Sequence, residues 1–590
     1  MTVSVNTGET EGIFGMRNYY FASRQVLWPI LVIASMMAGC ASVSTPLSTP
    51  SEPLRAATTG TLAQCAALSS TFSFPSTRLE SVALAPLGEY CLIKGKMHER
   101  VSPVDGQAYA IGFEMRLPQA WSGRFLYQGN GGTDGVVAPA DGGFALGSGG
   151  LLKNALQMGF AIISSDAGHS AAQNPLFGLD PQARLDYGYQ AVGKLTPMAK
   201  ALIQAAYGRL PDRSYIAGSS NGGRHAMVAA SRYTDQFDGF LANAPGIHLH
   251  KSAAANLSNV KRWDRVATIK RVNNQADFES ALPQSERQLI AKAILAKCDA
   301  LDGAVDGLVQ DITACRKAFD LKTDVPTCKG ERDGQTCLSA EQKEVVALAF
   351  ASPKFSNGEP FYSSFPYDPG IVQNGWAEWK FRSSVGNTRN PVSVGFMFSS
   401  PPSKQVTMAT DNYQSAAFAL GFNVDIEVPK LSATSGVYTE SAMSFMTPPE
   451  ATRLHALRAK GGKLLVVHGV ADPIFSADDI ADWFVALDAN HQGKANSFAR
   501  LFFVPGMGHT RGGPATDQFD ALSALVQWVE HGEAPDRILA AGRGAGNRGG
   551  VNTELPADWP ANRSRPLCVY PKVARYKSGD SELADSFVCN

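Results

Sequence analysis

Short apolar runs that end at glycine-rich turns recur along the first 250 residues and predict a buried sheet. Longer stretches with helical spacing of apolar positions alternate with them. Strands interleaved with helices in this way are typical of an α/β fold with a largely parallel sheet. We predict strands at 107–117, 124–128, 160–165 and 213–218, and helices at 187–208 and 223–233.

The alternation fades after about residue 248 and returns after residue 450. The segment 248–450 is rich in aromatic residues, proline and asparagine. Strand patterns reappear at 462–468 and 499–504. We therefore expect an α/β core in two parts, 62–247 and 451–590, separated by a large insertion at 248–450 that forms a lid over the site.

The first 61 residues are not expected to belong to this fold. Residues 26–40 form an apolar run that is too short for a confident membrane span and is typical of a signal peptide at 1–40. The run ends in Met37-Ala-Gly-Cys40, which resembles a bacterial lipobox and implies lipidation of Cys40 at the outer membrane. A plain signal for secretion to the periplasm or beyond is the alternative. Residues 41–61 are rich in Ser, Thr and Pro and predict a flexible tether.

The composition narrows the class of protein. The 590 residues suffice for one large core and an insertion. The 53 basic and 53 acidic residues cancel, and no basic block is present that would attract nucleic acid. We expect a monomer that binds a small-molecule substrate and touches a membrane only through the lipid anchor.

Eight cysteines remain when Cys40 is set aside. An even number in an exported chain indicates disulfides. Short separations favour pairing in order along the chain, although many other pairings of eight cysteines are possible. No C-x-x-C spacing occurs, which disfavours a metal cluster. The predicted pairs are Cys65–Cys91, Cys298–Cys315, Cys328–Cys337 and Cys568–Cys589.

Candidate chemistry begins at the turn between strand 213–218 and helix 223–233. Gly218-Ser-Ser220-Asn-Gly222 matches the G-x-S-x-G pattern, which presents a serine on a sharp strand-to-helix turn. The helix that follows directs free N–H groups toward a developing oxyanion. An ordinary turn of an α/β protein is the alternative to Ser220 as a nucleophile.

An acid and a histidine follow the last two predicted strands. Asp472 comes after strand 462–468 and His509 after strand 499–504. The order Ser, Asp, His is that of α/β-hydrolases, so we expect an α/β-hydrolase core. Ser220 would be the nucleophile, His509 the base and Asp472 the residue that orients the histidine. His468 precedes the acid and is interpreted as pocket lining.

A glycine-rich loop, 128–135, directly follows the strand 124–128. It lacks both common patterns that bind nucleotide phosphates. In a serine hydrolase, a loop in this place supplies one backbone N–H of the oxyanion hole, and the residue after the nucleophile, here Asn221, supplies the other. We expect this use, rather than a simple connection.

A second loop carries clustered aspartates. Asp299, Asp302 and Asp306 alternate with glycines and place several hard oxygens on one tight loop. Carboxylates together with backbone carbonyls are the ligands that calcium prefers. The spacing is not that of an EF-hand, and a turn cluster that binds no metal is the alternative.

Taken together, the motifs resemble the tannase and feruloyl esterase family over residues 62–590. The resemblance implies an α/β-hydrolase core with a large lid, a structural Ca²⁺ without an organic cofactor, and esters of aromatic acids as substrates. Within the family, the chain is most similar to members that hydrolyse mono(2-hydroxyethyl) terephthalate to terephthalate and ethylene glycol. The alternatives are a feruloyl esterase or tannase acting on plant phenolic esters and, remotely, a catalytically silent surface-binding lipoprotein. The motifs that carry the resemblance are Gly218–Arg224, Phe177–Asp186, Cys298–Asp306, His468–Asp472, Val504–Gly513 and Arg565–Cys568.

The resemblance also assigns further residues. The three aspartates with the carbonyls of Ala304 and Leu308 are the implied calcium ligands. The implied oxyanion donors are the N–H groups of Gly132 and Asn221. The implied pocket walls are Leu249, Trp379, Phe396 and Phe475.

The chain departs from the family at two places. A disulfide usual in the family joins the residue before the nucleophile to the residue after the histidine, and here these are Ser219 and Thr510. Terephthalate-monoester hydrolases grip the free carboxylate of the substrate with a lid arginine, and Val392 stands at that position. Arg389 and Arg382 are the candidates to replace it, because a guanidinium can bind a carboxylate through two hydrogen bonds.

Overall fold

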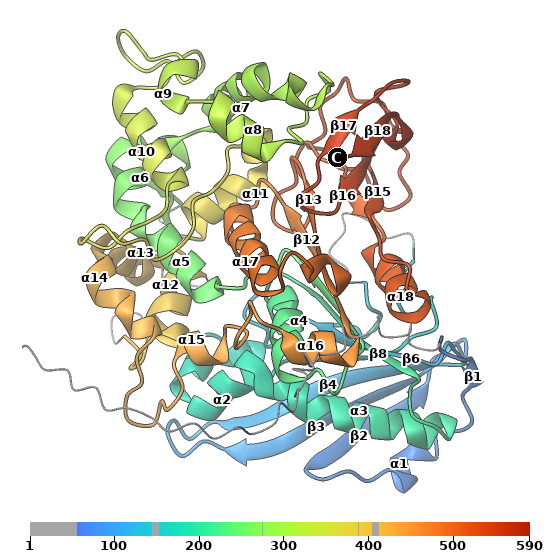
Figure 1. Ribbon diagram of the computed structural model, residues 1–590. Coiled ribbons are helices and arrows are strands. Elements are labelled where there is room, and N and C mark those ends of the chain that lie inside the picture. The colour runs from blue at the N-terminus through green and yellow to red at the C-terminus, as the bar shows by residue number, and fades with distance from the viewer. Residues whose placement is uncertain (1–55, 144–152, 274, 387–388, 404–411) are drawn as a thin grey trace, which may run out of the picture. The chain divides into compact units, whose positions relative to one another are not determined.

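A nine-stranded mixed sheet runs through the computed structural model, which describes residues 56–143, 153–273, 275–386, 389–403 and 412–590 (Figure 1). The six strands β13-β12-β9-β8-β6-β7 are parallel, and β4, β3 and β2 extend the sheet antiparallel. The strands are β2 (Thr77–Leu84), β3 (Tyr90–Val101), β4 (Ala108–Pro118), β6 (Arg124–Gly129), β7 (Ala161–Ser165), β8 (Arg213–Ser219), β9 (Gly239–Asn243), β12 (Lys463–Gly469) and β13 (Ala499–Val504).

The predicted α/β class is confirmed, and each strand predicted from an apolar run is found within a residue or so of its expected bounds. The edge strand β2 and its neighbour β3 were not predicted. Along β2, no residue is fully buried, so this strand has no apolar run to reveal it. Its pairing with β3 comes from the fold as a whole, not from a local pattern.

Helices cover both faces of the sheet. Successive residues of a strand point to opposite faces, so Leu464 and Val466 of β12 belong to one hydrophobic cluster and Leu465 and Val467 to another. Burial on both faces explains the continuous apolar runs of the parallel strands. The first cluster includes α3 (Ala191–Tyr207), α4 (Asn221–Arg232) and α17 (Ala477–Asn490), and the second includes α18 (Ala521–His531).

The insertion at 248–450 is built mainly from short helices (Figure 1). They share a hydrophobic cluster with Phe177 and Tyr187, which precede α3 in the first part of the core. The described residues from 56 onward form one unit, so the insertion and the core are continuous. The helices are α5 (Leu249–Ser258), α6 (Val260–Val266), α7 (Gln284–Cys298), α8 (Ile312–Ala318), α9 (Leu321–Asp324), α10 (Ala340–Phe350), α11 (Asn374–Ala377), α12 (Asn390–Val392), α13 (Asn412–Gly421), α14 (Val424–Glu427) and α15 (Ala442–Phe445), with a hairpin of β10 (Arg271–Val272) and β11 (Gln275–Ala276).

The C-terminal segment forms two small antiparallel sheets beside β13, drawn in red in Figure 1. One contains β14 (Gln518–Phe519), β15 (Arg537–Ala541) and β16 (Ser564–Cys568), and the other β17 (Ala574–Tyr576) and β18 (Phe587–Cys589). The remaining elements are β1 (Gly60–Thr61), α1 (Leu68–Thr71), β5 (Ala120–Trp121), α2 (Pro181–Leu185) and α16 (His455–Lys460).

The four predicted disulfides are formed, each between cysteines that follow one another along the chain, which confirms the pairing. Disulfides of this number are typical of proteins that fold in an oxidising compartment. The predicted signal segment, Cys40 and most of the tether lie outside the described residues.

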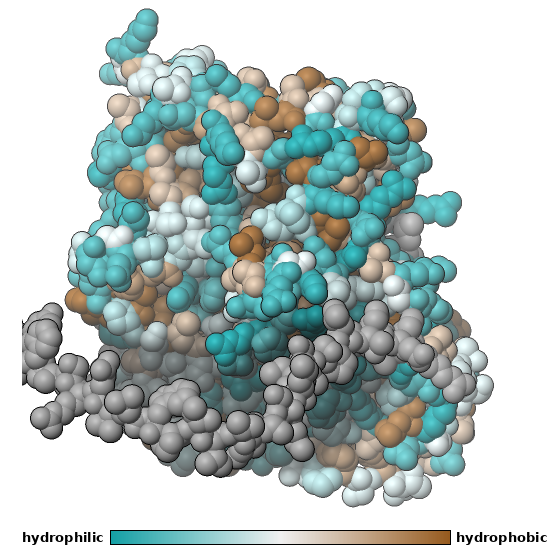
Figure 2. Space-filling model, in the orientation of Figure 1, coloured by the Kyte–Doolittle hydropathy of each residue, from teal (hydrophilic) through white to brown (hydrophobic). Residues whose placement is uncertain are grey.

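Among the described helices, none has the length and apolar character that crossing a membrane requires. On the face shown in Figure 2, hydrophobic residues are interspersed with hydrophilic ones over both the insertion and the core. Such a mixture is usual for a surface in contact with water.

Candidate active site

Ser220 lies where β8 ends and α4 begins. Its backbone has φ 62° and ψ −124°, a conformation that residues other than glycine rarely adopt. A Cβ at Gly218 would collide with the backbone of Gly222, and a Cβ at Gly222 with the carbonyl of Gly129. The two glycines of the motif are therefore required by the close approach of three backbone segments at this turn.

His509 and Asp472 extend a chain of hydrogen bonds from Ser220. The Nε2 atom of His509 lies 2.8 Å from Oγ of Ser220, and its Nδ1 atom lies 2.7 Å from Oδ2 of Asp472. The two residues follow β13 and β12, as predicted. These distances are within the reach that a serine, a base and an orienting acid need.

The carboxylate of Asp472 is fixed by its surroundings. Its other oxygen, Oδ1, accepts the N–H groups of Ile474 and Phe475 at 2.9 and 3.0 Å. Burial alone would raise the pKa of Asp472, but its contacts with His509, His468 and these amides outweigh burial and bring the pKa below its usual range. An ionised Asp472 holds a proton on Nδ1 of His509 and leaves Nε2 to accept the serine proton.

The structure corrects the interpretation of His468 as a pocket wall. Its side chain is fully buried, and Nε2 lies 2.9 Å from the carbonyl of Phe475 and 3.8 Å from Oδ2 of Asp472. His468 thus packs behind the acid and supports the loop that carries it. The strand pattern shows only that a histidine ends β12, and does not show which face of the loop it contacts.

Gly132 and Asn221 approach Ser220 from two different segments and line the same cavity. Asn221 is the first residue of α4, where N–H groups have no partner within the helix. Gly132 lies in the loop after β6 with φ 66°. Two backbone N–H groups beside a serine are the arrangement of an oxyanion hole.

A cavity of about 50 Å³ opens beside Ser220. Of the expected walls, Leu249, Trp379 and Phe475 line it. The rings of Trp379 and Phe475 stand edge-to-face against the His509 imidazole, with ring centroids 5.5 and 5.2 Å away. An aromatic acyl group bound between these rings would lie next to the serine.

Phe396 is not among the residues that line this cavity, which corrects its expected role as a pocket wall. Its side chain is fully buried in the insertion, and its carbonyl accepts a hydrogen bond from Arg184 at 2.8 Å. Phe398 lines the cavity instead. Residues 393–398 form a π-helical turn, which changes the side chains that share a face.

The two candidate arginines differ in position. Arg389 lines the cavity, with its guanidinium carbon 5.3 Å from the ring centroid of Trp379. Arg382 forms ion pairs with Asp277, Glu279 and Glu378, and its side chain is 55% exposed. Arg389 therefore lies beside Ser220, and Arg382 does not.

The aspartate loop is held from the C-terminal segment. Oδ2 of Asp306 accepts from Nε and Nη2 of Arg565 at 3.0 and 2.6 Å, and the Asp306 carbonyl accepts from Arg563. Oδ2 of Asp302 is buried without a hydrogen-bond partner. Burial and the nearby carboxylates of Asp306 and Asp299 raise the pKa of Asp302 to about 7.

The fit of this loop to calcium is partial. The free oxygen of Asp302 and the mutual repulsion of the carboxylates favour a cation. The pairing of Asp306 with Arg565 competes with one. Within the described ranges, no three acidic, histidine or cysteine side chains converge as a metal-binding group.

Several cavity residues were not predicted from the sequence. Ile474 is the neighbour of a predicted wall, and Thr133 the neighbour of a predicted oxyanion donor, so proximity in sequence could have indicated both. The others come from helices whose orientation no local pattern reveals. The unpredicted lining residues are Thr133, Tyr187, Ala253, Asn390, Ser393, Phe398 and Ile474.

Comparison with known proteins agrees with this geometry. A family model described as tannase and feruloyl esterase matches residues 92–590. The chain is 37% identical over 539 residues to mono(2-hydroxyethyl) terephthalate hydrolase of Piscinibacter sakaiensis, covering 86% of each chain. It is 27% identical over 477 residues to feruloyl esterase B of Aspergillus niger, covering 78% of this chain and 80% of that one.

A solved structure shows the same fold. The crystal structure of feruloyl esterase B from Aspergillus oryzae matches with a TM-score of 0.67 at 22% identity, and covers 90% of this chain and 100% of that chain. The family match spans most of the chain, and the terephthalate hydrolase is well above the identity at which family membership is secure. The chain therefore belongs to the tannase and feruloyl esterase family of carboxylic ester hydrolases.

Proposed function

We propose that the protein is a serine esterase that cleaves esters of small aromatic acids with Ser220, His509 and Asp472. The observation that carries this proposal is the unbroken chain of hydrogen bonds from Ser220 Oγ through both nitrogens of His509 to Asp472. It ends at a cavity with aromatic walls. The family match supports ester hydrolysis independently of this geometry.

Acylation uses the chain of hydrogen bonds in one direction. Nε2 of His509 takes the proton of Ser220 while Oγ attacks the ester carbonyl carbon. The oxyanion that forms accepts the N–H groups of Gly132 and Asn221, each worth about 3–4 kcal/mol of barrier by analogy with other serine hydrolases. The histidine then gives its proton to the departing alcohol, which leaves an acyl-serine.

Deacylation uses the same groups again. Water loses a proton to His509 and attacks the acyl carbon, and the same two N–H groups hold the second oxyanion. Ser220 recovers its proton as the aromatic acid leaves. Asp472 stabilises the imidazolium in both steps and does not itself take up a proton.

The cation in the cavity favours an acyl group that carries a second carboxylate. Arg389 lies over Trp379, the aromatic wall beside His509. A guanidinium there can bind the free carboxylate of mono(2-hydroxyethyl) terephthalate while the ester lies at Ser220. The similarity to the terephthalate hydrolase supports this substrate.

A phenolic ester is the second candidate substrate. Thr133, Asn390 and Ser393 also line the cavity, and they are neutral groups that can hydrogen-bond the phenol hydroxyls of a ferulate or gallate ester. Relatives named as feruloyl esterases support this reading. The catalytic steps are the same for both substrates.

We also propose that residues 248–450 act as a lid and that Ca²⁺ binds their aspartate loop. Asp299, Asp302 and Asp306 with the carbonyls of Ala304 and Leu308 would hold the ion, and the unpartnered Oδ2 of Asp302 supports it. When bound, calcium would screen the repulsion between the carboxylates and stabilise the loop. A lipid anchor on Cys40 and a monomeric state complete the proposal.

Three substrates measured side by side test the specificity. Purified protein is assayed on mono(2-hydroxyethyl) terephthalate, methyl ferulate and methyl gallate, with Ser220→Ala as the blank. A preference for the terephthalate monoester is expected from Arg389. A preference for either phenolic ester selects the second candidate, and no activity above the blank on any ester contradicts the proposed function.

A further inference from the structure

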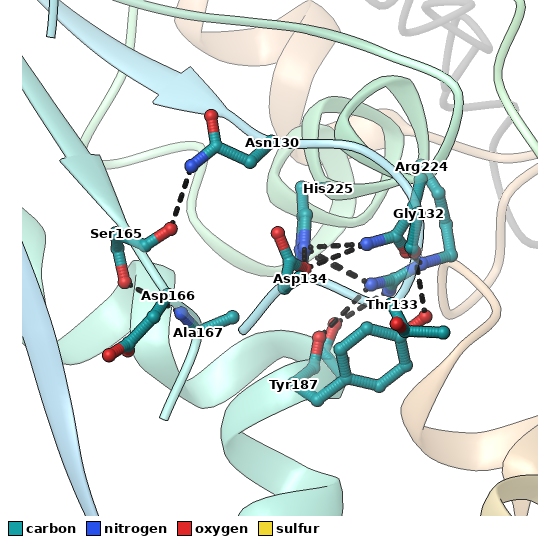
Figure 3. A network of polar contacts seen from close by, with 12 residues as sticks. Asn130, Gly132, Thr133, Asp134, Ser165, Asp166, Ala167, Tyr187, Arg224 and His225 are labelled. Carbon is teal, nitrogen blue, oxygen red and sulfur yellow. Dashed lines mark hydrogen bonds and ion pairs between the residues drawn. The ribbon is translucent and has the colours of Figure 1, made fainter. Parts of the chain in front are cut away.

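A buried polar network contacts both residues that carry the proposed oxyanion donors, Gly132 and Asn221. Figure 3 shows part of this network. Its centre is Asp134, two residues after Gly132, with a side chain that is 1% exposed. Oδ2 of Asp134 accepts a hydrogen bond from Nδ2 of Asn221 at 2.8 Å and lies 3.0 Å from Nε2 of His225. One carboxylate oxygen thus joins the loop after β6 to the first turn of α4.

The hydrogen bonds close into a ring that includes the side chain of Asn221 and the carbonyl of Gly132, the two residues that carry the proposed donors. Nε of Arg224 donates to Oδ1 of Asn221 at 2.7 Å, and Nη2 donates to the carbonyl of Tyr187 at 3.0 Å. The hydroxyl of Tyr187 donates to the carbonyl of Gly132 at 3.3 Å. The ring therefore runs from Asp134 through Asn221, Arg224 and Tyr187 back to the loop. Figure 3 labels its members Asp134, Arg224, Tyr187 and Gly132.

The loop has an uncommon backbone conformation at two of its residues. Gly132 and Asp134 have φ values of 66° and 54°, in the left-handed region that glycine adopts freely and aspartate adopts more readily than most other side chains. Residues persist in such conformations only where the surroundings over-determine them. The direction of the Gly132 N–H follows from these dihedral angles, so whatever fixes the loop also fixes that donor.

Burial also acts on the titratable groups of the network. It raises the pKa of Asp134 well above its usual value, and the nearby guanidinium of Arg224 opposes this rise without cancelling it. Burial also lowers the pKa of His225 well below its usual value, which keeps its ring neutral. A buried polar network costs stability unless each polar group in it has a hydrogen-bond partner. A network that contacts both donor residues therefore points to a role in positioning them.

We propose that Asp134 is a positioning residue for the oxyanion hole, which it holds together by binding the side chain of Asn221 from the Gly132 loop. Asp134 does not touch the substrate, and it acts through Gly132 and Asn221. The inference rests on the proposed serine-esterase function. In this role, the buried carboxylate keeps two donors from different segments at a fixed separation.

Two substitutions at this position test the role. Asp134→Ala removes the link, and we expect kcat on 4-nitrophenyl acetate to fall about 10- to 100-fold with little change in KM, because the donors act mainly in the transition state. Asp134→Asn keeps an oxygen that can accept from Asn221, and we expect it to recover most of the lost kcat. A purely structural role would not produce this split between kcat and KM.

The matched control is Asp166→Ala. Asp166 is half-buried directly after the neighbouring strand β7, and the described partners of its Oδ1 are the N–H groups of Gly112 and Gly168. We expect this variant to lose stability and to keep its kcat.

A second pair of variants tests the role if Asp134→Ala does not fold. Tyr187→Phe removes only the hydroxyl that binds the Gly132 carbonyl, and Tyr215→Phe removes a buried hydroxyl that binds Glu530 instead. We expect a several-fold loss of kcat in the first variant and none in the second.

The decisive readout is the affinity for phenylboronic acid, which forms a tetrahedral adduct with an active serine. Its inhibition constant should rise in Asp134→Ala and Tyr187→Phe in parallel with the loss of kcat, and stay constant in both controls. If the wild type is active but kcat and the inhibition constant are unchanged in Asp134→Ala, the positioning role is wrong while the proposed function stands. If Asp134→Ala does not fold, unchanged values in Tyr187→Phe lead to the same conclusion. A wild type without Ser220-dependent hydrolysis would overturn the proposed function together with the positioning role.

Discussion

At the scale of single residues, the proposed function divides the side chains around Ser220 into those that carry the chemistry and those that select the substrate. Arg389 is proposed for the second group, since it lines the cavity with its guanidinium over Trp379. Arg382, only seven positions earlier, is engaged by three carboxylates. The contrast between the two arginines therefore gives a matched pair for a test of specificity.

Arg389→Ala should raise KM for mono(2-hydroxyethyl) terephthalate by about 10- to 100-fold, the usual worth of a charge-assisted hydrogen bond. KM for methyl ferulate, which lacks a second carboxylate, should change little. Arg382→Ala should leave both values as they are. Steady-state kinetics on the two esters check this, and an equal loss on both would show that Arg389 shapes the cavity and does not read charge.

The position of Arg389 could not be predicted from the sequence, although the triad could. Ser220, Asp472 and His509 each follow a strand of the parallel part of the sheet. The carboxyl ends of parallel strands meet at one edge of the sheet, so residues that follow them come together. Arg389 and Phe396 have no such anchor, and the strand that holds His468 does not show which side of the following loop its ring contacts.

At the scale of elements, the π-helical turn η8 (Glu378–Arg382) places Lys380 in an unusual environment. Its ammonium lies 3.7 Å from the ring centroid of Phe365. Burial lowers the pKa of Lys380 to about 7, although the charge of Asp472 opposes the shift. An unfolded chain binds the lysine proton up to about pH 10, so the unfolded state holds more protons than the folded state between pH 7 and 10.

The free energy of unfolding should therefore rise with pH across this window, as the cost of burying the charged lysine disappears. Below pH 7, the full cost is present. Lys380→Met removes the titration and should be more stable than the wild type at pH 6, with the difference shrinking toward pH 9. Urea unfolding at pH 6, 7.5 and 9 measures it, and parallel curves for the two proteins would contradict the shift.

The elements themselves were predictable in proportion to their burial. The strands β6, β7, β8 and β12 are buried on both faces and appear as apolar runs. The short helices and π-helical turns of the insertion are fixed by contacts far apart in the sequence, so their bounds carry no local signal. The error at Phe396 arose in one of these turns.

At the scale of the whole molecule, the aspartate loop connects the insertion to the C-terminal segment. Arg563 and Arg565 of β16 and its preceding turn hold Asp306 from that side. The loop is remote in sequence from all three triad residues. A cation bound there would therefore act on the stability of the assembled parts more than on the chemical steps.

Chelation of calcium should lower the melting temperature by about 5 °C or more, since a ligand that binds only the folded state stabilises it by mass action. The initial rate of protein that is still folded should stay nearly constant. Asp302→Asn should show the lower melting temperature without chelator and no further response to it. Differential scanning calorimetry with parallel rate assays tests this, and an immediate loss of rate with the fold intact would contradict it.

The central claim is that Ser220 is the nucleophile, and its adjacent serine supplies the control. A fluorophosphonate probe reacts covalently with a serine that a neighbouring histidine activates, and peptide mass spectrometry locates the adduct. The account predicts labelling of Ser220 in the wild type and in Ser219→Ala, together with loss of labelling and of ester hydrolysis in Ser220→Ala. Labelling elsewhere in the chain, or hydrolysis that persists in Ser220→Ala, would contradict it.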